Sequence, residues 1–205
     1  MAGSEVVVVG AGGHALVALD VLASAGFRVA GCVSDDGNAR ADVAAMGVDM
    51  LGSTDLLLRQ LAERPVDIFV AIGDNRARRD ITLQLESSGA RPVAAISPYA
   101  VVSAHAVVAP GTLLMPGAIV NALTTIGPGA IVNTAASVDH ECQVGPFVHL
   151  APGVALAGNV TVGEGSLVGI GAAVVPGRRI GAWSTVGAGA TVVSIGLFLT
   201  DGTPS

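Results

Sequence analysis

The chain has 205 residues, enough for one or two domains, and only 3% of them are aromatic. Its formal net charge is −6 and it has no basic cluster, which argues against a nucleic acid as partner. Its mean hydropathy is +0.68, but Pro or Gly recurs every few residues in the uncharged run 92–138, so no apolar helix of about 20 residues is expected to cross a membrane.

The first half of the chain, residues 1–95, alternates between strand-like and helix-like patterns. Strands are expected at 6–9, 29–33, 68–72 and 93–96, and helices at 15–25, 54–62 and 76–87. This alternation predicts a small parallel sheet whose strands are joined by right-handed crossovers. Residues 1–95 are therefore expected to form a small Rossmann-like α/β domain.

A glycine-rich turn, Gly-Ala-Gly-Gly-His at 10–14, lies between the first expected strand and helix. Glycines there let backbone N–H groups approach a phosphate at the positive end of the helix. The pattern Gly-x-Gly-x-x-Ala, with Asp35 farther on, also occurs in dinucleotide folds. This segment has about half of the six strands of such a fold, which favours a mononucleotide or nucleotide sugar over NAD. A dinucleotide-binding turn needs no imidazole at the position of His14. This histidine therefore indicates another ligand, and the alternative is that it merely caps the helix.

An aliphatic residue occupies every sixth position from Ile96 to Val192 without interruption, and the residue four positions later is nearly always small. A period of six matches neither the 3.6 of a helix nor the 2 of a strand. It fits a solenoid of triangular coils with three six-residue edges, in which the aliphatic side chain points into the prism. Residues 96–205 are therefore expected to form a left-handed parallel β-helix.

Coils of eighteen residues place residue n+18 directly above residue n, about 4.8 Å away. Gly158 should thus lie one coil above His140, which Glu141 follows directly in the sequence. His149 lies one and a half edges farther around the coil. On a single prism the two imidazoles point to different sides, so they can share a site only if copies pack edge to edge around a threefold axis.

These groups predict acyl-transfer chemistry. The His140 imidazole can take a proton from an attacking amine or hydroxyl, and Glu141 would fix its tautomer and raise its basicity. The Gly158 N–H can stabilise the oxyanion of a tetrahedral intermediate. The alternatives are a surface ion pair for His140 and Glu141 and a structural role between subunits for His149.

Two cysteines, Cys32 and Cys142, do not make a disulfide framework, and no signal peptide is visible. A cytoplasmic protein is expected. Cys142 offers an acyl-enzyme as an alternative mechanism, but it occupies one of the small, inward positions of the repeat, which makes this mechanism less favoured. No metal is expected, because no three ligands fall at corresponding coil positions.

Three segments, 10–15, 133–153 and 157–160, resemble the sialic acid O-acetyltransferase-like sugar acyltransferases, a hexapeptide-repeat family. Within it the chain is most similar to bacterial nucleotide-sugar N-acetyltransferases that act on a 4-amino-4,6-dideoxyhexose. The resemblance covers nearly the whole chain. It implies a homotrimer that binds acetyl-CoA between adjacent β-helices and takes a nucleotide-linked amino sugar as the other substrate. By this resemblance His140 is the general base, Glu141 its partner and Gly158 the oxyanion contact.

The resemblance also implies binding residues. Asn133 and His149 would lie at the acetyl end of acetyl-CoA, and Ile170 and Ala188 farther along its groove. Contacts to the nucleotide sugar would come from six residues of the first half: Gly12, Gly13, His14, Asp35, Asp36 and Gly73. The chain departs from the family at 193–205, where the Gly-x-Pro-Ala tail that helps to shape the far end of the CoA groove is missing.

Other functions share parts of this pattern. An O-acetyltransferase of a sialic acid-like or capsular sugar would use the same groups with a hydroxyl nucleophile. A non-catalytic trimer could use the repeat as a scaffold or binding module. A γ-class carbonic anhydrase has the same solenoid but needs three zinc-binding histidines per site, which this chain does not supply. Uracil, thymine and guanine all carry an N–H that Asp35 or Asp36 could accept, so the base of the nucleotide stays open.

Overall fold

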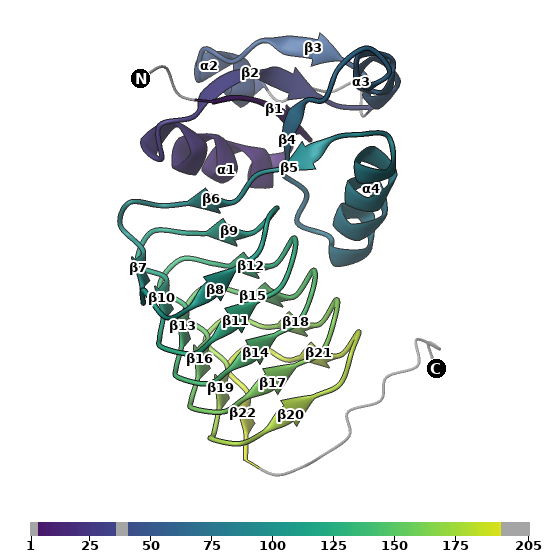
Figure 1. The fold of residues 1–205 in the computed structure, drawn as a ribbon. Helices are drawn as coiled ribbons and strands as arrows, with labels where there is room; N and C mark the ends of the chain where they lie inside the picture. The colour runs from purple at the N-terminus through teal and green to yellow at the C-terminus, as the bar shows by residue number, and fades with distance from the viewer. Residues whose placement is uncertain (1–3, 36–40, 194–205) are drawn as a thin grey trace. The chain divides into compact units, whose positions relative to one another are not determined.

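The computed structural model describes residues 4–35 and 41–193. The chain divides into two compact units, Met1–Pro98 and Tyr99–Ser205 (Figure 1). In the described part, no helix is both long and apolar enough to span a membrane. Asp36 and the C-terminal residues 194–205, on which two of the expectations above fall, lie outside the described residues.

The first unit contains a parallel sheet with strand order β3-β2-β1-β4-β5. Its elements are β1 (Glu5–Val9), α1 (Gly13–Ser24), β2 (Arg28–Val33), α2 (Ala41–Ala45), β3 (Met50–Gly52), α3 (Thr54–Leu61), β4 (Asp67–Val70), α4 (Asn75–Ser87) and β5 (Arg91–Pro92). The chain returns from the edge strand β3 to β4, next to β1. The expected Rossmann-like sheet is confirmed, and the point where its strand order reverses lies between β1 and β4.

Valine side chains of β1 pack in the hydrophobic core between the sheet and the helices that cover it. Val7 and Val9 pack with Leu57 of α3 and Leu85 of α4, and Leu19 of α1 is also buried. The burial of this face fixes where β1 ends, so the glycine-rich turn lies at the carboxyl edge of the sheet, beside the end of β4.

Three local expectations are corrected. The sequence analysis missed α2 and β3, which are short and contain only five and three residues. Of the expected strand 93–96, only Ala95–Ile96 is a strand, β6, and the separate strand β5 (Arg91–Pro92) precedes it. Pro92 ends β5 without an N–H to donate, which suits its place in the edge strand of the sheet.

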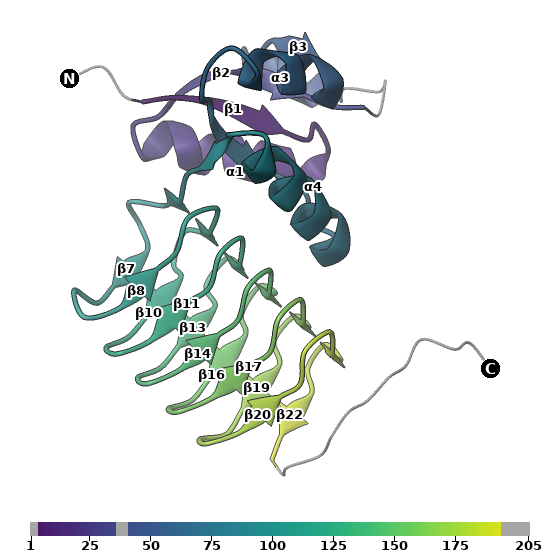
Figure 2. The same ribbon diagram turned by 45° about the vertical axis from the view of Figure 1, so that its right-hand side comes forward.

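The second unit is the expected left-handed β-helix, whose short parallel strands form three faces (Figure 2). Face 1 contains β7 (Val101–Val102), β10 (Ile119–Val120), β13 (Ser137–Val138), β16 (Ala155–Leu156), β19 (Ala173–Val174) and β22 (Thr191–Val192). Face 2 contains β8 (Val107–Val108), β11 (Thr125–Ile126), β14 (Gln143–Val144), β17 (Thr161–Val162) and β20 (Arg179–Ile180). Face 3 includes β9 (Leu113–Leu114), β12 (Ile131–Val132), β15 (His149–Leu150), β18 (Leu167–Val168) and β21 (Thr185–Val186).

The register between coils is eighteen residues, as in the pairing of Val120 with Val138 and of Val138 with Leu156. The second residue of each strand points inward, and Val120 and Val138 are fully buried. The small residue that precedes the next strand, such as Ala136, is buried beside them. Period six therefore arises because each edge contributes one aliphatic side chain to the core of the prism.

From Gly111 onward, each corner of the prism contains a residue with left-handed backbone. From Gly111 to Gly189 each sixth residue has a positive φ, and six of these are not glycine: Leu123, Ala135, Glu141, Phe147, Asn159 and Trp183. The residue before it makes no ladder hydrogen bond through its N–H, and six of the ten prolines occupy this position: Pro110, Pro116, Pro128, Pro146, Pro152 and Pro176. Proline fits there because it has no N–H to leave unsatisfied.

Where this corner residue is not proline, its N–H needs an acceptor or stays open. Asn133 Oδ1 accepts from the N–H of Thr134 at 2.8 Å, and Asp139 Oδ1 accepts from that of His140 at 2.8 Å. For Gly158, Ile170 and Ala188, no acceptor lies within hydrogen-bond distance in the part of the chain that the structure describes. The same holds for Ala122 and Ala182, so in the described coils several N–H groups stay open at positions that proline could fill.

Candidate active site

His140 and Glu141 occupy the corner between β13 on face 1 and β14 on face 2. His140 Nδ1 lies 3.0 Å from Glu141 Oε2, and each side chain is 58% exposed. A carboxylate can only accept, so Nδ1 holds the proton and Nε2 is left as an acceptor. A hollow of about 450 Å³ lies beside this corner on face 1, where Asp139 and Ala157 contribute to its lining. The arrangement presents an oriented base beside an open space.

Gly158 lies one coil above His140, as the repeat predicts. A Cβ built on Gly158 would lie 2.5 Å from His140 Cε1 and 2.6 Å from Nε2, so the imidazole ring covers the Gly158 Cα. The φ of Gly158 is not in the left-handed region. Glycine is therefore needed here for space. The open Gly158 N–H lies on the same coil corner as the imidazole.

Asn133 and His149 form a second cluster, on face 3 and at its corner with face 1. Asn133 Nδ2 lies 3.1 Å from His149 Nε2, while Asn133 Oδ1 accepts the Thr134 N–H at 2.8 Å. The backbone contact fixes the orientation of the amide, so Nδ2 donates and His149 Nε2 accepts, with the imidazole proton on Nδ1. The structure brings Asn133 and His149 together but leaves His140 at a different corner of the prism.

Ile170 and Ala188 lie on successive coils of the corner between face 3 and face 1. Both side chains are exposed, Ile170 to 62%, and the Gly189 N–H donates to the Ile170 carbonyl at 2.8 Å. They share this corner with Asn133. The four residues expected to contact acetyl-CoA therefore line one corner and the adjoining strand, and His140 with Glu141 lies across face 1 from them.

The expected nucleotide-sugar residues gather at the carboxyl edge of the sheet in the first unit. Gly12 is the N-cap of α1 and Gly13 its first residue, so His14 lies within the first turn and is not the cap. A Cβ on Gly73, after β4, would lie 4.0 Å from His14 Cβ. Burial, and secondarily the charge of Arg78, lowers the pKa of His14 to about 4, which keeps this imidazole neutral at neutral pH.

Asp35 has a contact of its own at the start of α3. Its Oδ1 accepts the N–H of Thr54 at 2.8 Å, so the carboxylate satisfies one of the free N–H groups at the start of that helix. This structural contact occupies one oxygen of the carboxylate. A role in binding the nucleotide base stays a prediction for Asp35, and Asp36 lies outside the described residues.

Arg78 of α4 is a site residue that the sequence analysis missed. Its side chain is 1% exposed; Nη1 donates to the carbonyls of Ile72 at 3.0 Å and Gly73 at 3.1 Å, and Nη2 donates to Asn75 Oδ1 at 2.7 Å. Burial lowers its pKa to about 10, so the guanidinium stays charged at neutral pH. Arg78 holds the segment after β4 in place and puts a buried positive charge near the glycine-rich turn.

Comparisons with known proteins identify the family and the fold. Residues 5–85 match the PglD N-terminal domain. A histidine-to-asparagine variant of perosamine N-acetyltransferase from Caulobacter crescentus, solved with CoA and GDP-perosamine, is 44% identical with a TM-score of 0.87, over 94% of this chain and 90% of that one. The acetyltransferase domain of PglB from Neisseria gonorrhoeae, solved with acetyl coenzyme A, is 37% identical with a TM-score of 0.82, over 93% of both chains. WeeI from Acinetobacter baumannii, 22% identical with a TM-score of 0.67 over 93% of this chain and 97% of that one, shares the fold. No curated protein matches in sequence.

The chain belongs to the bacterial nucleotide-aminosugar acetyltransferases of the hexapeptide family. It is an acyltransferase that uses acetyl-CoA, as the sequence predicts. The scaffold and carbonic anhydrase alternatives are thereby set aside. Within residues 4–35 and 41–193, no three His, Cys, Asp or Glu side chains gather as metal ligands.

Cys142 of the acetyltransferase lies inside the prism. Its side chain is 0% exposed, Sγ donates to the Ala157 carbonyl at 3.2 Å, and burial raises the pKa of the thiol. A buried thiol cannot meet a thioester in the groove and is a poor nucleophile. The structure therefore favours direct transfer over an acyl-enzyme on Cys142.

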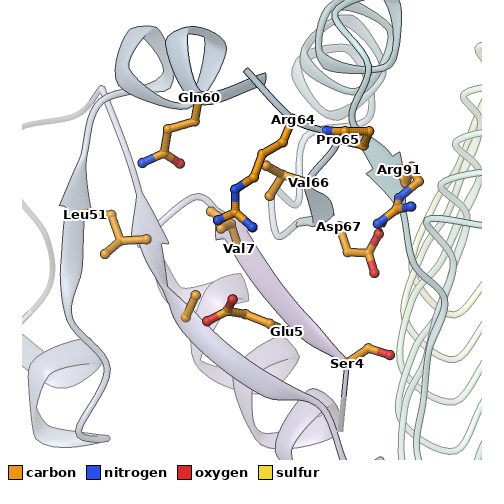
Figure 3. A pocket seen from close by; sticks show the side chains of 11 residues that line it. Ser4, Glu5, Val7, Leu51, Gln60, Arg64, Pro65, Val66, Asp67 and Arg91 are labelled. Atoms are coloured by element: carbon orange, nitrogen blue, oxygen red, sulfur yellow. Dashed lines mark hydrogen bonds and ion pairs between the residues drawn. The ribbon is translucent and has the colours of Figure 1, made fainter. Parts of the chain in front are cut away.

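A separate hollow of about 420 Å³ lies at the amino-terminal edge of the sheet (Figure 3). Val7 and Leu51 contribute apolar surface, and Arg91 Nε pairs with Asp67 Oδ1 at 2.7 Å on its rim. It lies at the end of β1 opposite to the glycine-rich turn, and none of the described residues expected to bind the nucleotide sugar lines it. This hollow is not part of the candidate active site.

Gly158→Ala is expected to lower kcat by about 10²-fold, the scale of lost acid–base assistance. The new methyl group would overlap the His140 ring and displace the imidazole from its position against residue 158. Stability should change little, since the ring is exposed and free to move. The unfolding midpoint and kcat measured together test this. Gly181→Ala is the control, because a Cβ there meets only Ser184 Oγ at 3.4 Å; equal activity of the two variants would contradict the prediction.

Arg78→Leu is expected to destabilise the first unit by about 1–3 kcal/mol for each buried carbonyl left without a donor. It should also raise the KM for the nucleotide sugar more than that for acetyl-CoA. Urea unfolding and steady-state kinetics measure the two effects. Arg79→Leu is the matched control, since the Arg79 side chain is 39% exposed and forms an ion pair with its neighbour Asp80 at 3.0 Å. An Arg78→Leu protein as stable as this control would refute the role given to Arg78.

Proposed function

We propose that this acetyltransferase transfers the acetyl group of acetyl-CoA to the 4-amino group of a nucleotide-linked 4-amino-4,6-dideoxy sugar, with GDP-perosamine as the first candidate. The observation that carries the proposal is the His140 imidazole, paired with Glu141 and packed against Gly158 of the next coil, whose N–H is open. The name of the 44% identical relative supports N-acetylation and the guanine nucleotide. We also place the enzyme in the cytoplasm, in keeping with its two free, buried cysteines.

His140 acts through Nε2, since Nδ1 holds its proton against Glu141. Nε2 accepts a proton from the sugar amine while the amine nitrogen bonds to the thioester carbonyl carbon. The Gly158 N–H donates to the carbonyl oxygen, where negative charge develops. When the carbon–sulfur bond breaks, the imidazolium returns the proton to the leaving thiolate. The products are the acetamido sugar and CoA.

Face 1 of the β-helix is the proposed contact between three copies. Its outward side chains are uncharged and mostly small, as at Ser137, Ala155 and Ala173. The two halves of the candidate site lie at the two corners that border this face. If face 1 of each copy points to a threefold axis, the His140 corner of one copy meets the Asn133 corner of the next. A homotrimer with its active sites between subunits follows from this packing.

The remaining groups fit the two substrates. The open N–H groups of Ile170 and Ala188 lie on one corner and suit the amide carbonyls of the pantetheine chain. In the first unit, the start of α1 at Gly12 and Gly13 suits the diphosphate, because free N–H groups and the helix dipole favour negative charge there. His14 and Gly73 lie beside this turn and would contact the nucleotide sugar.

The test measures thiol release from acetyl-CoA with GDP-, UDP- and dTDP-linked 4-amino-4,6-dideoxy sugars, with mass detection of the products. The expected result is one added acetyl group on GDP-perosamine. The matched control is the same nucleotide sugar with a hydroxyl at C4, which should not react. Acetylation of the hydroxyl analogue would point to O-acetylation, and no reaction across the panel would overturn the proposal.

A further inference from the structure

Asp139, next to the proposed base, is held by contacts from two coils. Asp139 Oδ1 accepts the His140 N–H at 2.8 Å and Asn121 Nδ2 at 3.0 Å, the latter from the preceding coil. The Asp139 carbonyl accepts Thr124 Oγ1 at 2.6 Å, and the same hydroxyl accepts the Cys142 N–H at 3.1 Å. The corner 139–142 is therefore tied to the coil before it on both sides of His140.

The repeat explains why this corner needs such a support. At six other corners proline occupies the place of His140, and its ring fixes φ without any N–H to satisfy. A histidine at this place has a backbone N–H that needs an acceptor, and its φ angle is not fixed by a ring. Asp139 Oδ1 supplies the acceptor that the His140 N–H requires, and so restrains the backbone from which the imidazole projects.

The charges around His140 are few. In the coil before it lie Ala122 and Leu123, and in the coil after it Gly158 and Asn159, all of them uncharged. Among the described residues, only Glu141 and Asp139 place a carboxylate next to the imidazole. Hydrogen bonds from the His140 N–H and the Asn121 amide hold the pKa of Asp139 below its usual value, so this acceptor stays ionised.

We infer that Asp139 is a positioning residue: its Oδ1, which also accepts a hydrogen bond from Asn121, fixes the backbone of His140. This keeps the imidazole packed against Gly158 of the next coil and within hydrogen-bond distance of Glu141. The inference rests on the proposed function, because it assigns Asp139 to the same reaction. Asp139 touches neither the thioester nor the amine in this role. Its effect should therefore appear in kcat and leave the KM for acetyl-CoA unchanged.

The experiment compares Asp139→Ala with Asp139→Asn in the acetyl-transfer assay over a range of pH. Asparagine keeps an Oδ1 acceptor and removes only the charge, so it should retain kcat within about threefold and move the acid limb of the pH profile to lower pH. Alanine removes the acceptor and should lower kcat by about 10–100-fold, up to the lower end of the range for complete loss of acid–base assistance. Ser103→Ala removes a comparable acceptor, from the His105 N–H at 3.2 Å, and should be neutral.

Two results would overturn the inference. An Asp139→Ala enzyme with unchanged kcat would show that the corner needs no such support. An Asp139→Asn enzyme as slow as Asp139→Ala would show that charge, and not the Oδ1 acceptor, matters. The unmodified enzyme in the same assay separates this inference from the proposed function, because a failure of that function would leave the unmodified enzyme inactive as well.

Discussion

Replacement of His140 by alanine is expected to reduce kcat by about 10³-fold, within the range for loss of a general base. The physical reason is the loss of the Nε2 acceptor. Glu141 points to Nδ1 and Asp139 Oδ1 already accepts the His140 N–H and the Asn121 amide, so neither carboxylate is placed to act for it. Binding of CoA and assembly of the protein should persist. Steady-state kinetics with calorimetric titration of CoA measure both.

His105→Ala is the matched control for this experiment. His105 lies on the same corner of the prism two coils earlier, is exposed and has no acidic neighbour in the sequence. Its loss should leave kcat unchanged. Glu141→Ala should cost about 10²-fold, less than the loss of the imidazole itself. If His140→Ala kept the rate of the unmodified enzyme, the general-base assignment would be wrong.

Ala155→Arg on face 1 is expected to dissociate the proposed trimer and to reduce activity by at least about 10²-fold. Ala155 also lines the hollow beside the His140 corner, so the mass of the assembly, and not the activity alone, decides the outcome. The threefold axis would bring three guanidinium groups together in a buried contact, and each unpaired buried charge costs several kcal/mol. Light scattering after size-exclusion chromatography measures the mass, and the thiol-release assay measures the activity.

Gln143→Arg on face 2 introduces the same charge at an exposed outward position of a neighbouring strand. Face 2 does not border both halves of the candidate site, so this control should remain assembled and active. A fully active Ala155→Arg protein of unchanged mass would show that face 1 is not the contact between copies.

The repeat made the second unit predictable from sequence, because each six-residue edge repeats one physical requirement. Val120 and Val138 occupy equivalent inward positions in neighbouring coils, and this regularity fixes the register of His140 under Gly158. The open N–H of Gly158 also follows from sequence once proline is seen at the equivalent corners. What the repeat cannot give is which face packs against another copy, since small outward residues such as Ala155 and Ala173 satisfy the fold on their own.

The first unit was less predictable because its elements depend on tertiary contacts. Met50–Gly52 is too short to show a strand period and exists through its pairing with β2. Arg78 looks like its neighbours Arg76 and Arg79 in the sequence. A signal was present, since Arg78, Thr82 and Leu85 share the buried face of α4, but a buried arginine becomes credible only when its acceptors, the Ile72 and Gly73 carbonyls, are seen.

The most direct test of a site shared between copies is the activity of mixed assemblies made by co-expressing His140→Ala with Asn133→Ala/His149→Ala. Each parent lacks one half of every site and should be nearly inactive. In a cyclic trimer that contains both parents, one of the three sites combines an intact His140 with an intact Asn133 and His149, so random mixing should restore about one quarter of the unmodified activity. Activity no higher than that of the parents, in assemblies shown to contain both chains, would contradict a site built from two copies.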